Sequence, residues 1–383
     1  MSHAPTRVLL TVPHLTSGDS PFREIVALAR FLPRDEFALT ICSLTARGFH
    51  EATPLLRGLG VEAFVAPFRP RDRRPRSLWR AWQAQKVIER RGPFDIQHSL
   101  DSSTSPWEAL MARLHGRRFV FSEHGSGVGR HAWLLRSKIW LANRIIAEAA
   151  RLADILLGYG GGPDRVRKVY NGIDFAEIDG HSEAVAMRDP AYLLVVGRVL
   201  TAEHHEDAIR ALALVSGDHA APRLGIAGFT AEPAYEHRLR TLTEGLGLGD
   251  RVDFLGFRRD IISLMRRSGA LISCQAGEGI SWSILEAMAC RLPVIAARTP
   301  ANAEVIEDGK TGTLVDVGDC EAWARAIRSL VEQPERFRAM AAAARSELER
   351  RFRARSAVEE IGEVYRELKP PVRRPPRAAP VAH

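Results

Sequence analysis

The sequence predicts an α/β protein of two Rossmann-like, doubly wound domains that face each other across a cleft. Its 383 residues are too many for one ordinary domain and suit two. Apolar strand-like runs alternate with amphipathic helical segments, a pattern typical of parallel sheets covered on both faces. The pattern occurs twice, and the polar segment Asn171–Pro190 separates the two copies. Because ligands of such sheets bind beyond the carboxyl ends of the strands, we expect a small-molecule site between the domains.

The first copy of the pattern spans residues 1–172 and is expected to form the N-terminal domain. Short runs rich in apolar and β-branched residues indicate strands, and longer runs with helical spacing of apolar residues indicate helices. The expected strands are Val8–Pro13, Phe37–Ser43, Glu62–Ala66, Asp95–His98, Phe119–Glu123 and Ile155–Gly158. The expected helices are Phe22–Leu32, Ala52–Leu59, Ser77–Arg90, Ser105–Leu114 and a long one at Ala132–Ala150.

The second copy spans residues 191–350 and follows a linker at residues 173–190. It opens on the strand Leu193–Gly197, and its first helix is expected at Glu206–Val215. Its other expected strands, each followed by a helix, are Arg223–Ala227, Val252–Leu255, Gly269–Cys274, Pro293–Ala297 and Gly312–Val315. Residues 351–368 are expected to carry a closing helix that starts at Ser356, whose hydroxyl suits an N-cap. The Arg- and Pro-rich tail at residues 369–383 is expected to be disordered.

The composition indicates a soluble globular protein. Hydrophobic residues make up 45% and charged residues 26% of the chain, which allows sizeable cores. No run approaches the ~18 to 20 uncharged apolar residues that a membrane span needs, and we expect no signal peptide. The four cysteines have no paired spacing, which argues against a disulfide framework and a zinc site and favours the reduced cytoplasm.

The net charge of +8 comes from two short segments rather than from the whole chain. Arg69–Arg91 and Lys369–His383 together carry more than this excess, so the remainder is slightly acidic and no nucleic-acid partner is expected. Trp79 and Trp82 lie among arginines in the first segment. They indicate either peripheral contact with anionic lipid at the inner face of a membrane, or a solvated helix whose tryptophans pack on its own sheet. The helix Ala132–Ala150, which also contains tryptophans, could extend such a surface.

The segment most specific for chemistry is Gly277–Ala289, which contains two glutamates separated by seven residues. Glu278 lies in a Gly-flanked loop after an expected strand, and Glu286 lies on the helix that starts near Ser281. Gly279 lets the backbone N–H groups that follow it approach a ligand closely, and at a helix N-terminus such groups bind phosphate. The two carboxylates can accept hydrogen bonds from the hydroxyls of a sugar or a ribose. The alternative is that Glu286 is a solvated helix carboxylate and Glu278 a favourable charge near a helix start.

With these residues the sequence resembles the family 4 glycosyltransferases, whose motif is Glu, seven residues, Glu. The resemblance covers nearly the whole chain up to Leu368 and rests on several segments in the family's order. These are Ser122–Gly125 (SEHG), Val169–Asp174 (VYNGID), Leu193–Arg198 (LLVVGR), Gly228, Asp250–Gly256 (DRVDFLG) and the closing helix with Tyr365. The resemblance implies a GT-B fold and a retaining transfer of a sugar from a nucleotide-sugar co-substrate to a glycan, lipid or small-molecule acceptor. It implies no cofactor and no metal.

The resemblance also implies roles for single residues, with the donor site in the C-terminal domain and the acceptor site in the N-terminal one. Arg198 would clamp the donor diphosphate, Glu278 would contact hydroxyls of the transferred sugar, and Glu286 would contact the ribose. The other implied donor contacts are Gly18, Gly228, Gly279 and the backbone amides of Ile280 and Ser281. His124 would lie near the sugar from the opposite domain; the alternative is a core or capping histidine. The catalytic candidates are therefore Glu278, His124 and Arg198.

The chain departs from the family around the diphosphate. Glu203 occupies the position of a lysine that binds the diphosphate in the family, His204 follows it in place of Gly, and Trp282 is a bulky neighbour of the phosphate site. A desolvated carboxylate beside a diphosphate is repulsive, on the order of several kcal/mol. Glu203 therefore points away, or another cation takes over, or the chain is a catalytically impaired partner subunit that binds sugar nucleotides. The candidates for the replacing cation are His204, His205 and Arg258.

Overall fold

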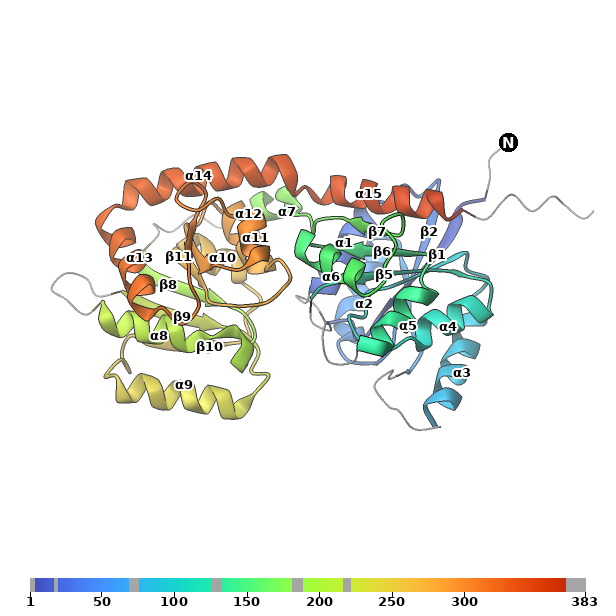
Figure 1. Cartoon of the computed structure of the whole chain (residues 1–383), viewed down its shortest axis with the longest axis horizontal. Coiled ribbons are helices and arrows are strands. Elements are labelled where there is room, and N and C mark those ends of the chain that lie inside the picture. The colour runs from blue at the N-terminus through green and yellow to red at the C-terminus, as the bar shows by residue number, and fades with distance from the viewer. Residues whose placement is uncertain are drawn as a thin grey trace, which may run out of the picture.

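The computed structural model describes residues 4–16, 20–68, 76–125, 132–180, 189–215 and 222–369. Some predicted features lie outside these ranges: Gly18, residues 69–75 of the basic segment, residues 181–188 of the linker and residues 370–383 of the tail. Figure 1 shows two α/β units, with helices α14 (Pro334–Arg351) and α15 (Ala354–Glu367) running along the same side of both.

The N-terminal unit contains a seven-stranded parallel sheet of order β3-β2-β1-β4-β5-β6-β7. Its strands are β1 (Thr6–Val12), β2 (Phe37–Ser43), β3 (Glu62–Val65), β4 (Ile96–Ser99), β5 (Arg118–Glu123), β6 (Arg144–Ala147) and β7 (Val166–Lys168). The chain adds β2 and β3 on one side of β1 and then crosses over to add β4 to β7 on the other side, so the strand order reverses between the parallel neighbours β1 and β4. At such a switch point the loops after the strands separate and leave room for ligands.

The C-terminal unit contains a six-stranded parallel sheet of order β10-β9-β8-β11-β12-β13. Its strands are β8 (Asp189–Val196), β9 (Arg223–Ala227), β10 (Val252–Gly256), β11 (Ser268–Ser273), β12 (Val294–Ala297) and β13 (Thr313–Val315). Its switch point lies between β8 and β11, which are paired. The predicted fold class, α/β with two Rossmann-like doubly wound units, is confirmed.

Helices cover both faces of each sheet. The N-terminal unit has α1 (Ser20–Phe31), α2 (Phe49–Gly58), α3 (Arg76–Glu89), α4 (Trp107–Leu114), α5 (Ala132–Leu141), α6 (Ala150–Gly158) and α7 (Phe175–Gly180). The C-terminal unit has η1 (Thr201–Glu203), α8 (His205–Leu214), α9 (Pro233–Gly245), α10 (Ile261–Arg267), α11 (Trp282–Ala289), α12 (Pro300–Val305) and α13 (Cys320–Glu332). Right-handed crossovers place α1 and α2 on one face of the first sheet and α3 to α6 on the other. The α15 helix returns from the C-terminal unit to pack against α1.

One stretch of the N-terminal unit differs from the prediction. The expected long helix Ala132–Ala150 ends at Leu141 as α5, and the next residues form β6, which is paired on both sides by β5 and β7. The expected strand at Ile155–Gly158 is instead the end of helix α6. A short apolar run fits a buried strand and a buried helix equally well, and pairing with distant strands decided between them.

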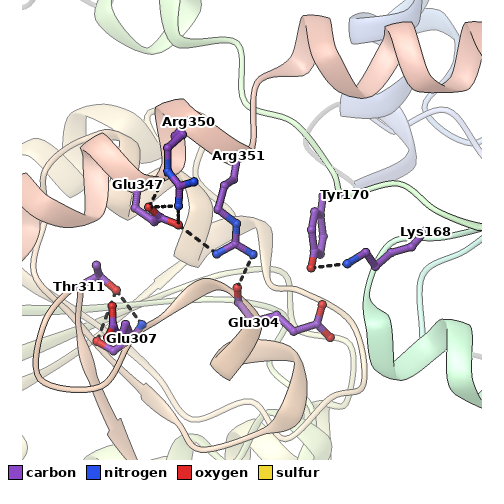
Figure 2. A network of polar contacts seen from close by, with 8 residues as sticks. All are labelled: Lys168, Tyr170, Glu304, Glu307, Thr311, Glu347, Arg350 and Arg351. Atoms are coloured by element: carbon purple, nitrogen blue, oxygen red, sulfur yellow. Dashed lines mark hydrogen bonds and ion pairs between the residues drawn. The ribbon is translucent and has the colours of Figure 1, made fainter.

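The two units are anchored where the chain passes between them. The chain leaves the first unit after Ile173 and returns after Phe352, and these two passages are hydrogen-bonded to each other, with Ile173 N donating to Phe352 O at 2.7 Å. Figure 2 shows Arg351 beside them, donating to the carbonyl oxygen of Glu304 at 3.0 Å. The rings of Tyr170 and Phe352 are in tilted contact, with their centroids 4.9 Å apart. The two passages of the chain between the units therefore form one packed junction.

Candidate active site between the two domains

The loop after β11 lies directly against the loop after β5. A side chain at Gly279 would place its Cβ 2.7 Å from the carbonyl oxygen of His124 and 2.6 Å from Oε1 of Glu148. Gly125 has a left-handed backbone with φ of 86°, and its Cβ would lie 2.9 Å from the backbone nitrogen of Gly279. Such a close approach of two backbones requires glycine on both sides. The structure thus brings two of the sequence-predicted segments, SEHG and the Glu278 loop, together across the domain interface.

The two glutamates of the C-terminal motif have different surroundings. Glu278 is half exposed, and its Oε2 lies 3.4 Å from Nε of Arg151 on α6. Glu286 is buried at 5% exposure and forms an ion pair with Arg23 of α1, whose guanidinium lies 5.4 Å from the ring centroid of Trp282. Glu286 is therefore not a solvated helix carboxylate. It reaches the N-terminal unit through Arg23, a residue that sequence reasoning missed.

The phosphate-binding site predicted at the start of α11 lies next to the N-cap residue of the helix. Ser281 is the N-cap residue with an extended backbone, its side chain makes no cap hydrogen bond, and its Oγ lies 2.8 Å from Oγ of Ser283. Ile280 is buried at 4% exposure and belongs to the core cluster of the interface. The first N–H groups of a helix, here from Trp282 onward, have no partner within the helix, and such a helix start suits a phosphate.

His124 lies between carboxylates that belong to the N-terminal unit. Its Nδ1 lies 3.0 Å from Oε2 of Glu148, which follows β6, and its Nε2 lies 3.5 Å from Oε2 of Glu24 on α1. The amide of Asn171 donates to the same oxygen of Glu148. Although burial alone would lower the pKa of His124, the neighbouring carboxylates raise it to about 9, so the ring is an imidazolium at neutral pH. Glu24 in turn has a pKa raised by burial.

A buried chain of hydrogen bonds connects Glu24 to the C-terminal helix. Oγ of Ser122 donates to Glu24 at 3.3 Å, and Nε2 of His98 lies 2.9 Å from the same Oγ. Nδ1 of His98 lies 2.7 Å from the hydroxyl of Tyr365 on α15. Burial lowers the pKa of His98 to about 3, so its ring is neutral and the chain fixes its tautomer, with Nε2–H donating and Nδ1 accepting. The network thus positions Glu24, one of the two acidic partners of His124, through side chains of β5, β4 and α15.

Arg198 and Glu203 lie at the carboxyl end of β8, beside the loop of Glu278, because β8 pairs with β11. Arg198 is 61% exposed, whereas the Glu203 side chain is 10% exposed, and the closest atoms of the two are 3.8 Å apart. Oε2 of Glu203 would lie 3.1 Å from a Cβ at Gly197, so this carboxyl lies under the turn after β8 rather than in solvent. Burial raises its pKa to about 7, although Arg198 acts in the opposite direction.

The three candidates for a replacing cation are differently placed. His204 links η1 to α8 in a left-handed backbone with φ of 52°. His205 is buried, and burial lowers its pKa to about 4, so its ring is neutral and supplies no charge. Arg258 is paired with Asp260, with Nη2 and Oδ2 2.6 Å apart. Arg198, by contrast, forms an ion pair with Glu203 at this edge of the sheet.

Gly228 allows the turns after β8 and β9 to touch. A Cβ at this position would overlap the carbonyl oxygen of Gly197. We expect Gly228→Ala to lower the free energy of unfolding by about 2 kcal/mol, because one of the two turns must move. Urea unfolding of the variant beside Gly245→Ala, a position with open space around it, measures this effect. Equal stability of the two variants would contradict the close contact.

The carboxylates around His124 make a prediction of their own. Glu148→Gln should lower the pKa of His124 by about 1 to 3 units, because an opposite charge within hydrogen-bond distance is removed. NMR titration of the His124 imidazole measures this pKa. Glu89→Gln, which removes the carboxylate that faces His115 instead, is the control and should leave the pKa of His124 unchanged.

The same pair contributes to stability: the stabilisation from the raised pKa of His124 is complete below pH about 6.5 and is lost as the pH rises to about 9. The free energy of unfolding should therefore decline less from pH 7 to 9 in Glu148→Gln than in the parent; an unshifted His124 would contradict the pair.

A small cavity lies at this interface. Its lining includes Glu24, His124, Glu148, Asn171 and Trp282, and its volume of about 20 Å³ is enough for roughly one water molecule. This cavity is too small for a sugar. Within the described residues no group of three or more His, Cys, Asp or Glu side chains could hold a metal ion.

Sequence reasoning missed Glu24 and Glu148, and a signal existed for only one of them. Glu148 fell inside the expected helix Ala132–Ala150; recognising β6 would have placed it at the carboxyl end of a strand adjacent to β5, and so beside His124. Glu24 lies on an ordinary amphipathic helix, and nothing in its spacing distinguishes it. Gly18 lies outside the described residues.

Comparison with known families matches a family model to each of the two units. The family model described as Glycosyltransferase Family 4 matches residues 23–177, and the model described as Glycosyl transferases group 1 matches residues 180–347. The Bacillus subtilis protein EpsD is 29% identical over 326 residues, which cover 79% of this chain and 84% of that protein. A D-inositol 3-phosphate glycosyltransferase of Acidothermus cellulolyticus is 27% identical over 350 residues, which cover 88% of this chain and 73% of that one.

Solved structures with the same fold include glycosyltransferases. Anabaena HepE in complex with UDP and glucose superposes with a TM-score of 0.77 at 21% identity, over 94% of this chain and 100% of that one. A glycosyltransferase from Rickettsia africae superposes with a TM-score of 0.79 at 18% identity, over 96% of this chain and 99% of that one. At these identities the likeness concerns the fold.

Proposed function

The chain belongs to the family 4 glycosyltransferases of GT-B fold and is a nucleotide-sugar-dependent glycosyltransferase, and we propose that it transfers a hexose with retention of configuration. The observation that carries the proposal is the contact across the interface between the Glu278 loop and the His124–Glu148 pair. It brings the loop of Glu278, to which we assign phosphate and sugar binding, against a protonated histidine of the other domain.

The arrangement supports a division of roles. Arg198 and the amides of Ile280 and Ser281 hold the diphosphate, since both supply donors aimed at an anion. Glu286 accepts from the ribose hydroxyls once Arg23 has moved aside, and Glu278 accepts from hydroxyls of the transferred sugar. His124, fixed by Glu148, donates to the sugar from the facing domain. Charges that develop on the leaving group thus meet fixed donors, which is the usual source of rate enhancement.

The proposed reaction is a substitution at the anomeric carbon on one face of the sugar. The bond from this carbon to the diphosphate oxygen breaks, and a bond to the acceptor hydroxyl oxygen forms. The hydroxyl proton passes to the leaving diphosphate, so the reaction needs no base from the protein. Basic side chains and the start of α11 balance the charge of the product nucleotide, so the reaction needs no metal for this purpose.

We propose UDP as the first donor nucleotide to test, because Anabaena HepE, which has the same fold, has been solved in complex with UDP-glucose.

The acceptor that we propose is a glycan, a lipid-linked molecule or a small molecule, and the compartment that we propose is the cytoplasm. Within the described residues no helix is long and apolar enough to cross a membrane. Contact at the inner membrane face through the segment Arg69–Arg91 is part of the same proposal, supported by the exposed Trp79 and Trp82.

The test is thermal stability against UDP, GDP, ADP, CDP and dTDP, followed by hydrolysis of the sugar nucleotide of the best base. A ligand at a hundred times its dissociation constant stabilises the folded state by about 2.7 kcal/mol, which raises the melting temperature visibly. We expect a shift with one base and slow release of free sugar with retained anomeric configuration. No shift with any nucleotide would overturn the proposal. A shift without turnover on any sugar nucleotide or acceptor would favour the impaired partner subunit.

A further inference from the structure

Two helices of the N-terminal unit, α3 and α5, carry tryptophans on their solvent side. The exposed fractions are 62% for Trp79, 47% for Trp82, 65% for Trp133 and 72% for Trp140. The chain has seven tryptophans, so more than half of them lie exposed on these two helices. Tryptophan is usually well buried in a soluble protein, and a group of exposed ones marks a binding surface. The alternative expected from the sequence, with Trp79 and Trp82 packed on their own sheet, is wrong.

The spacing of these residues makes each helix two-sided. Trp79 and Trp82 are three residues apart and Trp133 and Trp140 seven apart, so each pair shares one face of its helix. The opposite faces are already buried in the core, with Ile88 on α3 and Leu135 and Ile139 on α5. The four indole rings therefore lie largely outside the core of this unit, with about half or more of each exposed to solvent.

The two helices belong to one layer. Right-handed crossovers place α3, α4 and α5 on the same face of the sheet, and α4 contacts both of its neighbours. Leu114 at the end of α4 is 67% exposed. Figure 1 shows these three helices grouped on the part of the N-terminal unit away from α1 and α15. We define this layer, with Trp79, Trp82, Trp133 and Trp140, as the tryptophan face.

Basic side chains are interspersed with the tryptophans. Arg80 and Arg136 are exposed beside them, and Nζ of Lys86 lies 3.4 Å from the ring centroid of Trp82. The acidic side chain that α3 contributes is Glu89, which is paired with His115, and α5 contributes none. Indole rings with cations suit the boundary of a lipid bilayer, where rings enter the headgroup region and cations contact lipid phosphates.

We propose that the tryptophan face binds the surface of a bilayer containing anionic phospholipid. The proposal rests on the proposed function, because membrane contact is useful to a glycosyltransferase whose acceptor lies at the membrane. It extends the contact from the predicted basic segment to α5, which begins shortly after Gly125 at the domain interface. Contact with lipid would therefore hold the His124 side of the cleft close to the membrane surface.

The test is sedimentation of the full chain with vesicles of phosphatidylcholine alone and of phosphatidylcholine with a quarter phosphatidylglycerol. We expect binding to the anionic vesicles, at least tenfold weaker binding to neutral ones, and a loss on raising the salt, because screening weakens attraction to lipid phosphates. Trp133→Ser/Trp140→Ser should lower the vesicle affinity at least tenfold. Leu246→Ser, an exposed apolar residue of the C-terminal unit, is the matched control and should change nothing.

Several outcomes would overturn the tryptophan face. These are no binding to anionic vesicles, equal binding to both vesicle types, or equal binding by parent and double variant. Should the double variant not fold, quenching of parent tryptophan fluorescence by brominated lipid decides instead, and absent quenching contradicts the proposal. Nucleotide-induced thermal shifts of the same proteins separate the two proposals. Lipid binding without a nucleotide shift contradicts only the glycosyltransferase site, and a nucleotide shift without lipid binding contradicts only the tryptophan face.

Discussion

Replacing Arg198 with alanine should lower the affinity for UDP by about tenfold to a hundredfold. The guanidinium is 61% exposed just after β8, and it forms an ion pair with the buried Glu203. A hydrogen bond to a charged group contributes about 1.5 to 3 kcal/mol, and 1.4 kcal/mol corresponds to a factor of ten. Isothermal titration calorimetry at constant ionic strength measures the loss.

Two further variants make the Arg198 experiment specific. Arg198→Lys keeps the charge but loses the bidentate geometry, so its affinity should lie between those of the parent and the alanine variant. Arg240→Ala removes an exposed arginine that is paired with Glu236 on α9, and it should leave UDP binding unchanged. Unchanged affinity in Arg198→Ala would exclude Arg198 from the diphosphate site.

Donor binding should strengthen as the pH falls from about 8 to 6, because of Glu203. Its pKa of about 7 leaves the carboxyl mostly ionised at pH 8 and mostly neutral at pH 6. An ionised carboxyl beside a diphosphate opposes binding, whereas a neutral one does not and can donate a hydrogen bond. UDP-glucose is the probe, since its diphosphate does not titrate in this range. We expect up to about tenfold tighter binding over this window, with uptake of protons visible in buffers of different ionisation enthalpy.

Variants of Glu203 should remove this pH dependence. Glu203→Gln should bind UDP-glucose at pH 8 as tightly as the parent does at pH 6, and Glu203→Lys should bind more tightly still if the side chain faces the phosphates. In the parent, the carboxyl destabilises the fold progressively as the pH rises from about 4.5 through about 7. Glu203→Gln should therefore be more stable than the parent at pH 8, by up to about 3 kcal/mol. Identical pH profiles of parent and variant would mean that Glu203 does not reach the donor.

Much of the fold followed from local pattern. The strands at Phe37–Ser43 and Arg223–Ala227 begin and end at the predicted residues, because an apolar run bounded by polar turns permits little else. The prediction for Ala132 to Gly158 was wrong because the spacing of the apolar residues there fits both a helix and a strand. Only the pairing of β6 between β5 and β7 separates the strand from the helices on either side of it.

The candidate site divides in the same way. The sequence alone determined the Glu278–Glu286 motif, His124, Arg198 and the anomaly at Glu203, because each lies in a short segment whose residue types and spacing are informative by themselves. The tertiary structure decided what surrounds them. Glu24 and Glu148 reach His124 from α1 and from the end of β6, and their charge determines its protonation state, which no linear pattern records. The packing of distant segments also decides which side chains are buried. It buries Glu203 and so raises the pKa of its carboxyl, and it leaves the tryptophans of α3 and α5 exposed.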